Sequence, residues 1–234
     1  MTTLRTEKVT CGSDGSMDLH IWAPDAPPRS AILLIQEIFG VSAYIRDVAE
    51  ELAGAGYLVG APDVFWRFTS NWQADHDQAG LTASFEKVQQ LDFPKAVADC
   101  SAALAHLHSQ PGITTAPAVL GFCLGGTLAW GVAAMAEPSC CVSYYGSGVP
   151  SMLGMITQVS CPTLFHFGNT DSYIPSEGID AISEAISGHA GFVLNVETAG
   201  HAFDNHQSEM FYDEGAANSA WSKTMAFLAA HLPA

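Results

Sequence analysis

From residue 31 onward, short apolar runs alternate with longer segments of helical character, and this alternation constrains the fold more than any other feature of the chain. Short apolar runs bounded by Gly and Pro are typical of buried strands, whereas the longer segments are typical of helices. A chain that alternates in this way buries its strands in a parallel sheet covered by helices. We therefore predict an α/β fold with a mostly parallel central sheet of about eight strands and helices on both faces.

The alternation also assigns the individual elements. The expected strands occupy residues 7–11, 19–23, 31–36, 57–61, 118–121, 141–145, 163–167 and 192–197. The expected helices occupy residues 43–55, 81–90, 93–108, 124–136, 176–187 and 215–231. We expect the first two strands to form an antiparallel hairpin at the edge of the sheet. A chain of 234 residues suits one large α/β domain, so we predict a single domain over residues 1–234.

The charge balance excludes two classes of partner. The chain carries 8 Lys and Arg against 24 Asp and Glu, a formal net charge of -16. A protein this acidic does not offer the basic surface that nucleic acids and anionic membranes require. We expect it to act on a small molecule, as a monomer or a small homo-oligomer, and the acidity favours neither state.

The cysteines and the first residues bear on the compartment. The 6 cysteines include no CxxC pair, and residues 1–10 have no apolar stretch of the kind found in a secretory leader. We therefore predict a cytoplasmic protein with reduced thiols.

An uncharged segment at residues 117–136 is long enough to cross a bilayer. It begins with Pro117 and a short β-type run, and a glycine-rich cluster at 121–126 then interrupts it before a helical run. A buried strand, a tight turn and a buried helix explain this pattern, so we predict no membrane span.

The interruption contains the strongest chemical motif of the chain. Gly121-Phe122-Cys123-Leu124-Gly125 fits the GxSxG nucleophile elbow, with Cys in place of Ser. The elbow is a strained strand-to-helix turn, and flanking glycines prevent clashes while the nucleophile is held clear of the sheet. We interpret Cys123 as a nucleophile; the alternative is a small buried hydrophobic residue.

Two further residues follow in the order nucleophile, acid, base. Asp171 comes just after the expected strand 163–167, and His201 comes after the strand 192–197. In this arrangement His201 takes and returns a proton, while Asp171 fixes its tautomer and stabilises the imidazolium. For Asp171 the alternative role is to cap a turn.

Glu37 ends the expected strand 31–36, where a carboxylate can accept a thiol proton; the alternative is a solvated loop residue. The backbone N–H groups of Ile38 and Leu124 are the expected oxyanion donors. His76 and His206 lie in loops that can overhang the site. The histidines have no metal-ligand spacing, so we expect neither a metal nor a cofactor.

The chain resembles the dienelactone hydrolase family, also called carboxymethylenebutenolidases, which has the α/β-hydrolase fold. The resemblance covers essentially the whole chain and rests on Glu37, Cys123 in GFCLGG, Asp171, His201 in GHxF, and Pro62-Asp63. It implies hydrolysis of a small lactone or ester through an acyl-enzyme on Cys123. It also implies that Glu37 activates the thiol and that His201 with Asp171 serves acyl turnover.

One part of the family pattern is missing. Members that act on the butenolide carboxylate carry an Arg a few residues after GHxF and another before the elbow. Here Asp204-Asn205-His206 follows GHxF, and Lys87 is the only basic residue between Thr69 and Phe93. Arg67 is the remaining candidate cation, and without it we expect a neutral or apolar substrate. The candidate substrate contacts are Phe39, Trp66, Arg67, Phe122, Phe203 and His206.

The sequence therefore predicts a cysteine-dependent hydrolase of a small lactone or ester. A different class of function uses the same scaffold to sense oxidants or electrophiles through a reactive Cys123, without turnover. The pair Asp171 and His201 argues against it, because a sensor needs no deacylating base. An amidase or peptidase is a third alternative, which the family resemblance disfavours.

Overall fold

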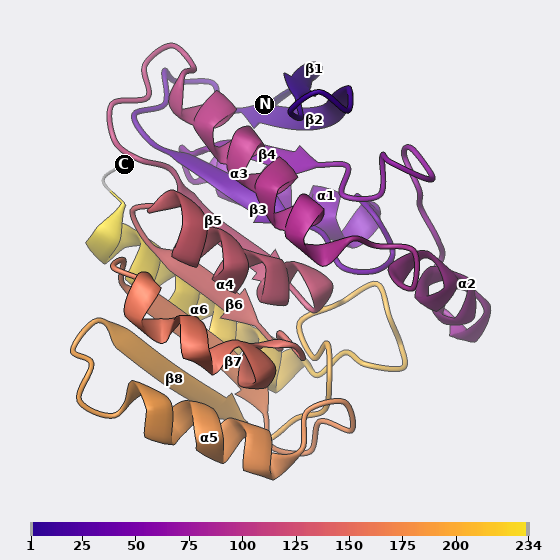
Figure 1. Cartoon of the computed structure of the whole chain (residues 1–234), viewed down its shortest axis with the longest axis vertical. Coiled ribbons are helices and arrows are strands. Elements are labelled where there is room, and N and C mark those ends of the chain that lie inside the picture. The colour runs from indigo at the N-terminus through magenta and orange to yellow at the C-terminus, as the bar shows by residue number, and fades with distance from the viewer. Residues whose placement is uncertain (1, 233–234) are drawn as a thin grey trace.

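An eight-stranded sheet forms the centre of the computed structural model, which describes residues 2–232 (Figure 1). The strands are β1 (Thr3–Thr10), β2 (Ser16–Ala23), β3 (Ala31–Ile35), β4 (Leu58–Pro62), β5 (Ala118–Phe122), β6 (Cys141–Tyr144), β7 (Thr163–Gly168) and β8 (Phe192–Glu197). Their spatial order is β1-β2-β4-β3-β5-β6-β7-β8. The first two strands form an antiparallel hairpin, β2 also pairs antiparallel with β4, and all later pairs are parallel. The predicted mostly parallel α/β sheet is confirmed.

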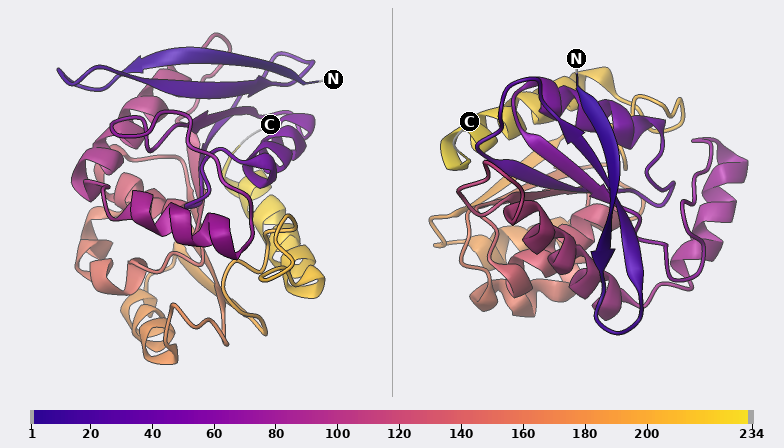
Figure 2. Two further views of the ribbon diagram at one scale, coloured as in Figure 1. Left: turned by 90° about the vertical axis from the view of Figure 1, so that its right-hand side faces the viewer. Right: turned by 90° about the horizontal axis from the view of Figure 1, so that it is seen from above.

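Helices cover both faces of this sheet. They are α1 (Ala43–Gly54), α2 (Gln78–Val88), α3 (Phe93–His108), α4 (Leu124–Ala136), α5 (Ser176–Ile186) and α6 (Glu214–His231). In Figure 2, left, α3, α4 and α5 lie on one side of the sheet, while α1 and α6 lie on the other. Helix α2 stands apart from both layers, at the right of Figure 1, where the parallel strands have their carboxyl ends.

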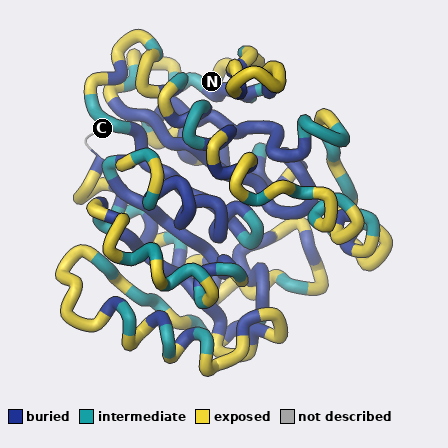
Figure 3. The backbone as a smooth tube through the Cα atoms, in the orientation of Figure 1, coloured by how far each residue is buried: buried dark blue, intermediate teal, exposed yellow. Residues whose placement is uncertain are grey.

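The core follows from the apolar runs. All residues of β3, β4, β5, β6 and β7 are buried, and Figure 3 shows this as a continuous dark band through the centre. Helix α4 packs on β5 and β6 and is buried from Gly125 through Ala133, which explains its lack of charge. Within residues 2–232, no helix has the length and apolar character to cross a membrane.

Several elements differ from the sequence predictions. A 3-10 segment, η1 (Val149–Gln158), forms where no element was expected, and it packs on α4 and α5. Helix α2 begins three residues earlier than expected, because the Asp77 side chain accepts a hydrogen bond from Gly80 N and caps the helix there. The strands of the first hairpin are also longer than expected, and their pairing extends from Thr3 to Ala23.

Candidate active site

A left-handed turn at Cys123 joins β5 to α4. Its backbone has φ 53° and ψ -115°, a conformation that non-glycine residues rarely adopt. The neighbouring glycines make the turn sterically possible. A Cβ atom on Gly121 would lie 2.0 Å from the carbonyl oxygen of Gly125, and one on Gly125 would lie 2.2 Å from that of Ile35. The turn therefore has the strained geometry of a nucleophile elbow.

The loops after β7 and β8 bring two further residues to the Cys123 sulfur. Nε2 of His201 lies 3.2 Å from Sγ of Cys123, and Nδ1 of His201 lies 2.7 Å from Oδ2 of Asp171. The other carboxylate oxygen of Asp171 accepts a hydrogen bond from the N–H of Tyr173. The structure thus places the sequence-predicted Cys, His and Asp in one hydrogen-bonded chain, the arrangement that activates a nucleophile in many hydrolases.

The charge of His201 depends on the sulfur beside it. Burial of the imidazole lowers its pKa, but the charge on the Cys123 sulfur and the hydrogen bond to Asp171 outweigh burial and raise the pKa of His201 to about 10. The protonated imidazole of His201 stabilises negative charge on the sulfur when the thiol gives up its proton. Acylation removes the negative charge of the sulfur, so the pKa of the imidazole falls and His201 gives up its proton more readily. The neutral imidazole can then act as a base.

Two backbone N–H groups are available beside the sulfur. Leu124 is the first residue of α4, where helical N–H groups have no partner within the helix. Ile38 follows Glu37 at the end of β3 and is buried. Neither N–H donates a hydrogen bond to another residue within 2–232. The positive end of the α4 dipole adds to the attraction for a developing oxyanion.

Glu37 is a buried carboxyl group, only 1% exposed. Nδ2 of Asn205 donates to its Oε2 at 2.6 Å. Burial raises the pKa of Glu37 to about 8, although the charge of His201 and the Asn205 hydrogen bond oppose the rise. Its other oxygen, Oε1, is buried and accepts no hydrogen bond from the described residues. The neighbouring Tyr145 hydroxyl also opposes the rise in the pKa of Glu37. Glu37 can therefore exchange a proton near neutral pH.

A small apolar cavity of about 40 Å³ opens beside His201. Phe39 is the one side chain among the sequence-predicted substrate contacts that lines it. None of the described residues that line it is Lys or Arg. The rings of Phe85 and Tyr173, 6.3 Å apart, are partly exposed. The lining residues are Ile38, Phe39, Leu81, Phe85, Ser147, Tyr173, His201, Ala202 and Phe211.

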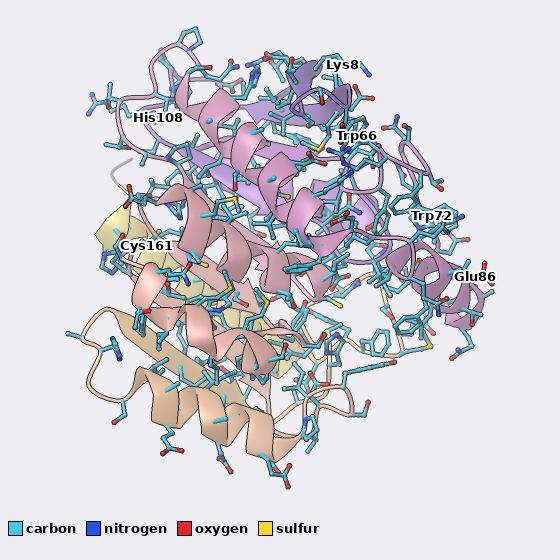
Figure 4. The ribbon with its side chains drawn as sticks, in the orientation of Figure 1. Lys8, Trp66, Trp72, Glu86, His108 and Cys161 are labelled. Atoms are coloured by element: carbon cyan, nitrogen blue, oxygen red, sulfur yellow. The ribbon has the colours of Figure 1, made fainter. Side chains whose placement is uncertain are left out.

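Arg67 and Trp66 lie elsewhere. The guanidinium of Arg67 binds Asp99 through Nε and Nη2, each at 2.8 Å, and binds Asp14 at 2.6 Å. Arg67 lines a different cavity, and Trp66 donates its indole N–H to the same Asp99. Figure 4 shows Trp66 close to the β1–β2 hairpin, where its ring packs on Gly15. The structure therefore does not bring these two residues to the cavity beside His201.

Three other candidate contacts also have different surroundings. Phe122 and Phe203 are fully buried among aromatic rings of the core, because they point inward from the end of β5 and from the loop after β8. His206 lies at the surface, where Nε2 is 2.9 Å from Oδ2 of Asp47. Packing explains the two phenylalanines, and a surface contact explains His206.

Sequence reasoning missed the roles of Asn205 and Tyr145. Asn205 is 168 positions from Glu37 in the sequence, and no spacing rule connects the two. Its position shortly after His201 drew attention only because family members carry an arginine in that region and this chain does not. Tyr145 was assigned to the end of a strand, but it has φ 37° and turns its ring toward His201, with ring centroids 5.2 Å apart.

Known proteins share this architecture. A family model described as "Dienelactone hydrolase family" matches residues 17–232. Carboxymethylenebutenolidase 1 of Cupriavidus pinatubonensis is 30% identical over 95% of both chains. A carboxymethylenebutenolidase of a Pseudomonas species is 32% identical over 92% of this chain and 90% of that protein. A dienelactone hydrolase-like promiscuous phosphotriesterase from metagenomic libraries has a similar solved structure, with TM-score 0.84 and 21% identity over 98% of both chains. That last likeness shows the fold alone.

Proposed function

The chain belongs to the dienelactone hydrolase family and is a hydrolase of lactone or ester bonds, and from this premise we propose that it acts through a thioester on Cys123. The observation that carries the proposal is the hydrogen-bonded chain from the Cys123 sulfur through His201 to Asp171. A sulfur held on a strained turn, at a helix N-terminus and against an imidazole, has the surroundings of a reactive cysteine.

The first half-reaction forms the acyl-enzyme. The Glu37 carboxylate accepts the thiol proton, and the thiolate attacks the carbonyl carbon of the substrate. The N–H groups of Ile38 and Leu124 stabilise the oxyanion. The C–O bond to the leaving oxygen then breaks, and that oxygen takes a proton from the His201 imidazolium. In a lactone the leaving oxygen stays on the acyl chain as a hydroxyl group.

The second half-reaction releases the acid. Neutral His201, oriented by Asp171, takes a proton from water as the water oxygen attacks the thioester carbon. The C–S bond breaks and Cys123 leaves as a thiolate beside the His201 imidazolium. Glu37 then returns its proton to the sulfur. The cycle adds one water across one ester bond, and every side chain ends in its starting state.

The lining of the cavity supports a neutral substrate. An anionic substrate needs a cation to compensate its desolvation, but the described residues that line the cavity include no Lys or Arg, and the charge of His201 is already paired with Asp171. The buried carboxyl of Glu37 adds repulsion once it is ionised. Aromatic and aliphatic side chains favour a small apolar acyl group or lactone ring.

Burst and steady-state hydrolysis of two matched substrates tests the proposal. We expect turnover of a neutral small ester with a burst of one leaving group per active site, and an acyl adduct on Cys123 in the mass spectrum. A carboxylate-bearing dienelactone should react more slowly. Stoichiometric thiol consumption without recycling would instead support the sensing alternative. A faster reaction with the anion would contradict the assignment of a neutral substrate.

A further inference from the structure

A second chain of hydrogen bonds reaches the site through Glu37. Asn205, fully buried, donates from Nδ2 to Oε2 of Glu37 at 2.6 Å. Nδ1 of His76 lies 2.8 Å from this Nδ2 and 3.0 Å from Oδ1 of the same amide. His76 is half-buried as a residue, and the chain ends at its ring, because Nε2 is buried without a partner among the described residues. The steps of the proposed reaction use Glu37 but neither of the two residues behind it.

The backbone fixes the orientation of the Asn205 amide. The N–H of Gln207 donates to Oδ1 of Asn205 at 3.1 Å, and a backbone N–H can only donate. Oδ1 is therefore the acceptor atom, and Nδ2 is the atom that faces Glu37. Asn205 can only donate to Oε2, whichever proton state Glu37 adopts. A hydrogen bond donated to a carboxyl oxygen favours the ionised form.

His76 is held from both sides. Its ring stacks on Phe39, with ring centroids 4.4 Å apart, and its carbonyl oxygen accepts a hydrogen bond from Ser208 Oγ. The loop that carries His76 is joined to the loop after β3 by a bridge between Gly40 and Gln73. The imidazole consequently contacts both Asn205 and Phe39, a residue that lines the cavity beside His201.

We propose that Asn205 and His76 are positioning residues that hold Glu37 by one oxygen and leave Oε1 free to exchange the thiol proton. The inference rests on the proposed function, because it concerns the group that activates Cys123. The partner of Oε2 is a neutral amide. The hydrogen bond therefore helps Glu37 to ionise without placing a fixed cation beside the cavity, which also keeps the site suited to neutral substrates.

Several titratable groups besides these face Glu37. His201 and Asp204 come from the loop after β8, Tyr145 from the end of β6, and Tyr44 from α1. The charge of His201 favours the carboxylate, whereas that of Asp204 disfavours it. These groups remain in an Asn205 variant, so a change in the ionisation of Glu37 there reports the lost amide.

The pH dependence of the acylation burst with a neutral p-nitrophenyl ester tests the inference. For Asn205→Ala we expect the midpoint to move upward by about one to two pH units, because a hydrogen bond to a charged group is lost. At pH 7 the burst rate should fall about 10- to 100-fold, and it should recover as pH rises. For His76→Gln we expect a smaller shift in the same direction, and His108→Gln, a remote exposed histidine, serves as its matched control.

The result that overturns the inference is a rate reduced by one factor at every pH, with an unmoved midpoint in both variants. That outcome would give Asn205 a structural role only. It is distinguishable from failure of the proposed function, in which the wild-type protein forms no acyl adduct on Cys123. If Asn205→Ala does not fold, as judged by circular dichroism, His76→Gln alone decides, because its half-buried side chain leaves the core intact.

Discussion

Two chains of hydrogen bonds meet at the active site, and they differ in how charge is balanced. The chain Asp171–His201–Cys123 joins groups that can all carry charge, and each member stabilises the charge of the next. The chain through Glu37 ends in a neutral amide and a half-buried imidazole. Burial therefore dominates at Glu37 and raises its pKa, whereas at His201 opposite charges overcome burial.

The difference suggests that the two chains have separate roles in the reaction. A charged chain can hold a proton and release it to the substrate or take one from water, because its charge changes are compensated locally. A carboxyl group with a neutral partner changes its charge near neutral pH, so it can set the charge of the sulfur before the substrate reacts. The variants below test this division, from the largest expected effect to the smallest.

Removing the nucleophile should abolish the function of both chains at once. For Cys123→Ala we expect kcat to fall on the order of a million-fold, since neither chain then has a sulfur to act on. The fold should survive, because the side chain is partly exposed and little volume is lost. Steady-state hydrolysis of a neutral ester gives the rate, and circular dichroism checks the fold. If the variant keeps one per cent of the activity, Cys123 is not the nucleophile.

Breaking the charged chain should impair both half-reactions. Asp171→Asn keeps the shape of the side chain but reverses the hydrogen-bonding preference of His201, so we expect kcat to fall about 10⁴-fold. Single-turnover kinetics should show slower acylation and slower deacylation. If only acylation slows, the division between the two chains is wrong.

Breaking the neutral chain should impair acylation alone. For Glu37→Gln we expect the burst rate to fall about 10²- to 10³-fold, while the acyl-enzyme hydrolyses normally. In the wild-type protein the carboxylate is the active form, so acylation should rise with pH through about 8, the pKa of Glu37. The variant should lose this rise. Equal effects on both half-reactions would make Glu37 a structural residue.

Arg67 belongs to neither chain, so its removal should change stability and leave activity nearly unchanged. Arg67→Met leaves the carboxylate of Asp99, 6% exposed, without a cation among the described residues and with only the Trp66 indole N–H as a donor. We expect a loss of about 1–3 kcal/mol in unfolding free energy. The value of kcat/KM should stay within about twofold. Urea denaturation measures the first effect. Lys8→Met, which removes the exposed partner of the half-buried Asp18, is the control and should cost under about 0.5 kcal/mol.

Much of the charged chain could be predicted from the sequence. The elbow motif, the order of Cys123, Asp171 and His201, and their places at strand ends all depend on local patterns and on parallel-sheet topology. The strands and most helices followed from hydrophobic periodicity for the same reason. Segment η1 was missed although Val149, Met152, Leu153 and Ile156 have helical spacing, because Pro150 and Gly154 interrupt the run and indicate a loop.

The neutral chain could not be predicted in this way. Its contacts join residues 129 and 168 positions apart, and they form only after loops from three parts of the chain have packed together. Side-chain direction was equally hidden. Phe203 and Arg67 both lie in loops that follow strands, where substrate contacts are expected. Phe203 points into the core, however, and Arg67 binds two carboxylates.

The steric origin of the elbow has a consequence for protein engineering. A Cβ atom added to Gly121 or Gly125 would lie only 2.0 or 2.2 Å from a backbone carbonyl oxygen. The close packing of the backbone around position 123 therefore defines the turn. The residue at that position accepts the conformation and does not create it. Libraries that vary only position 123 would therefore sample different nucleophiles, including oxygen ones, within one unchanged scaffold, so reactivity and foldability can be selected separately.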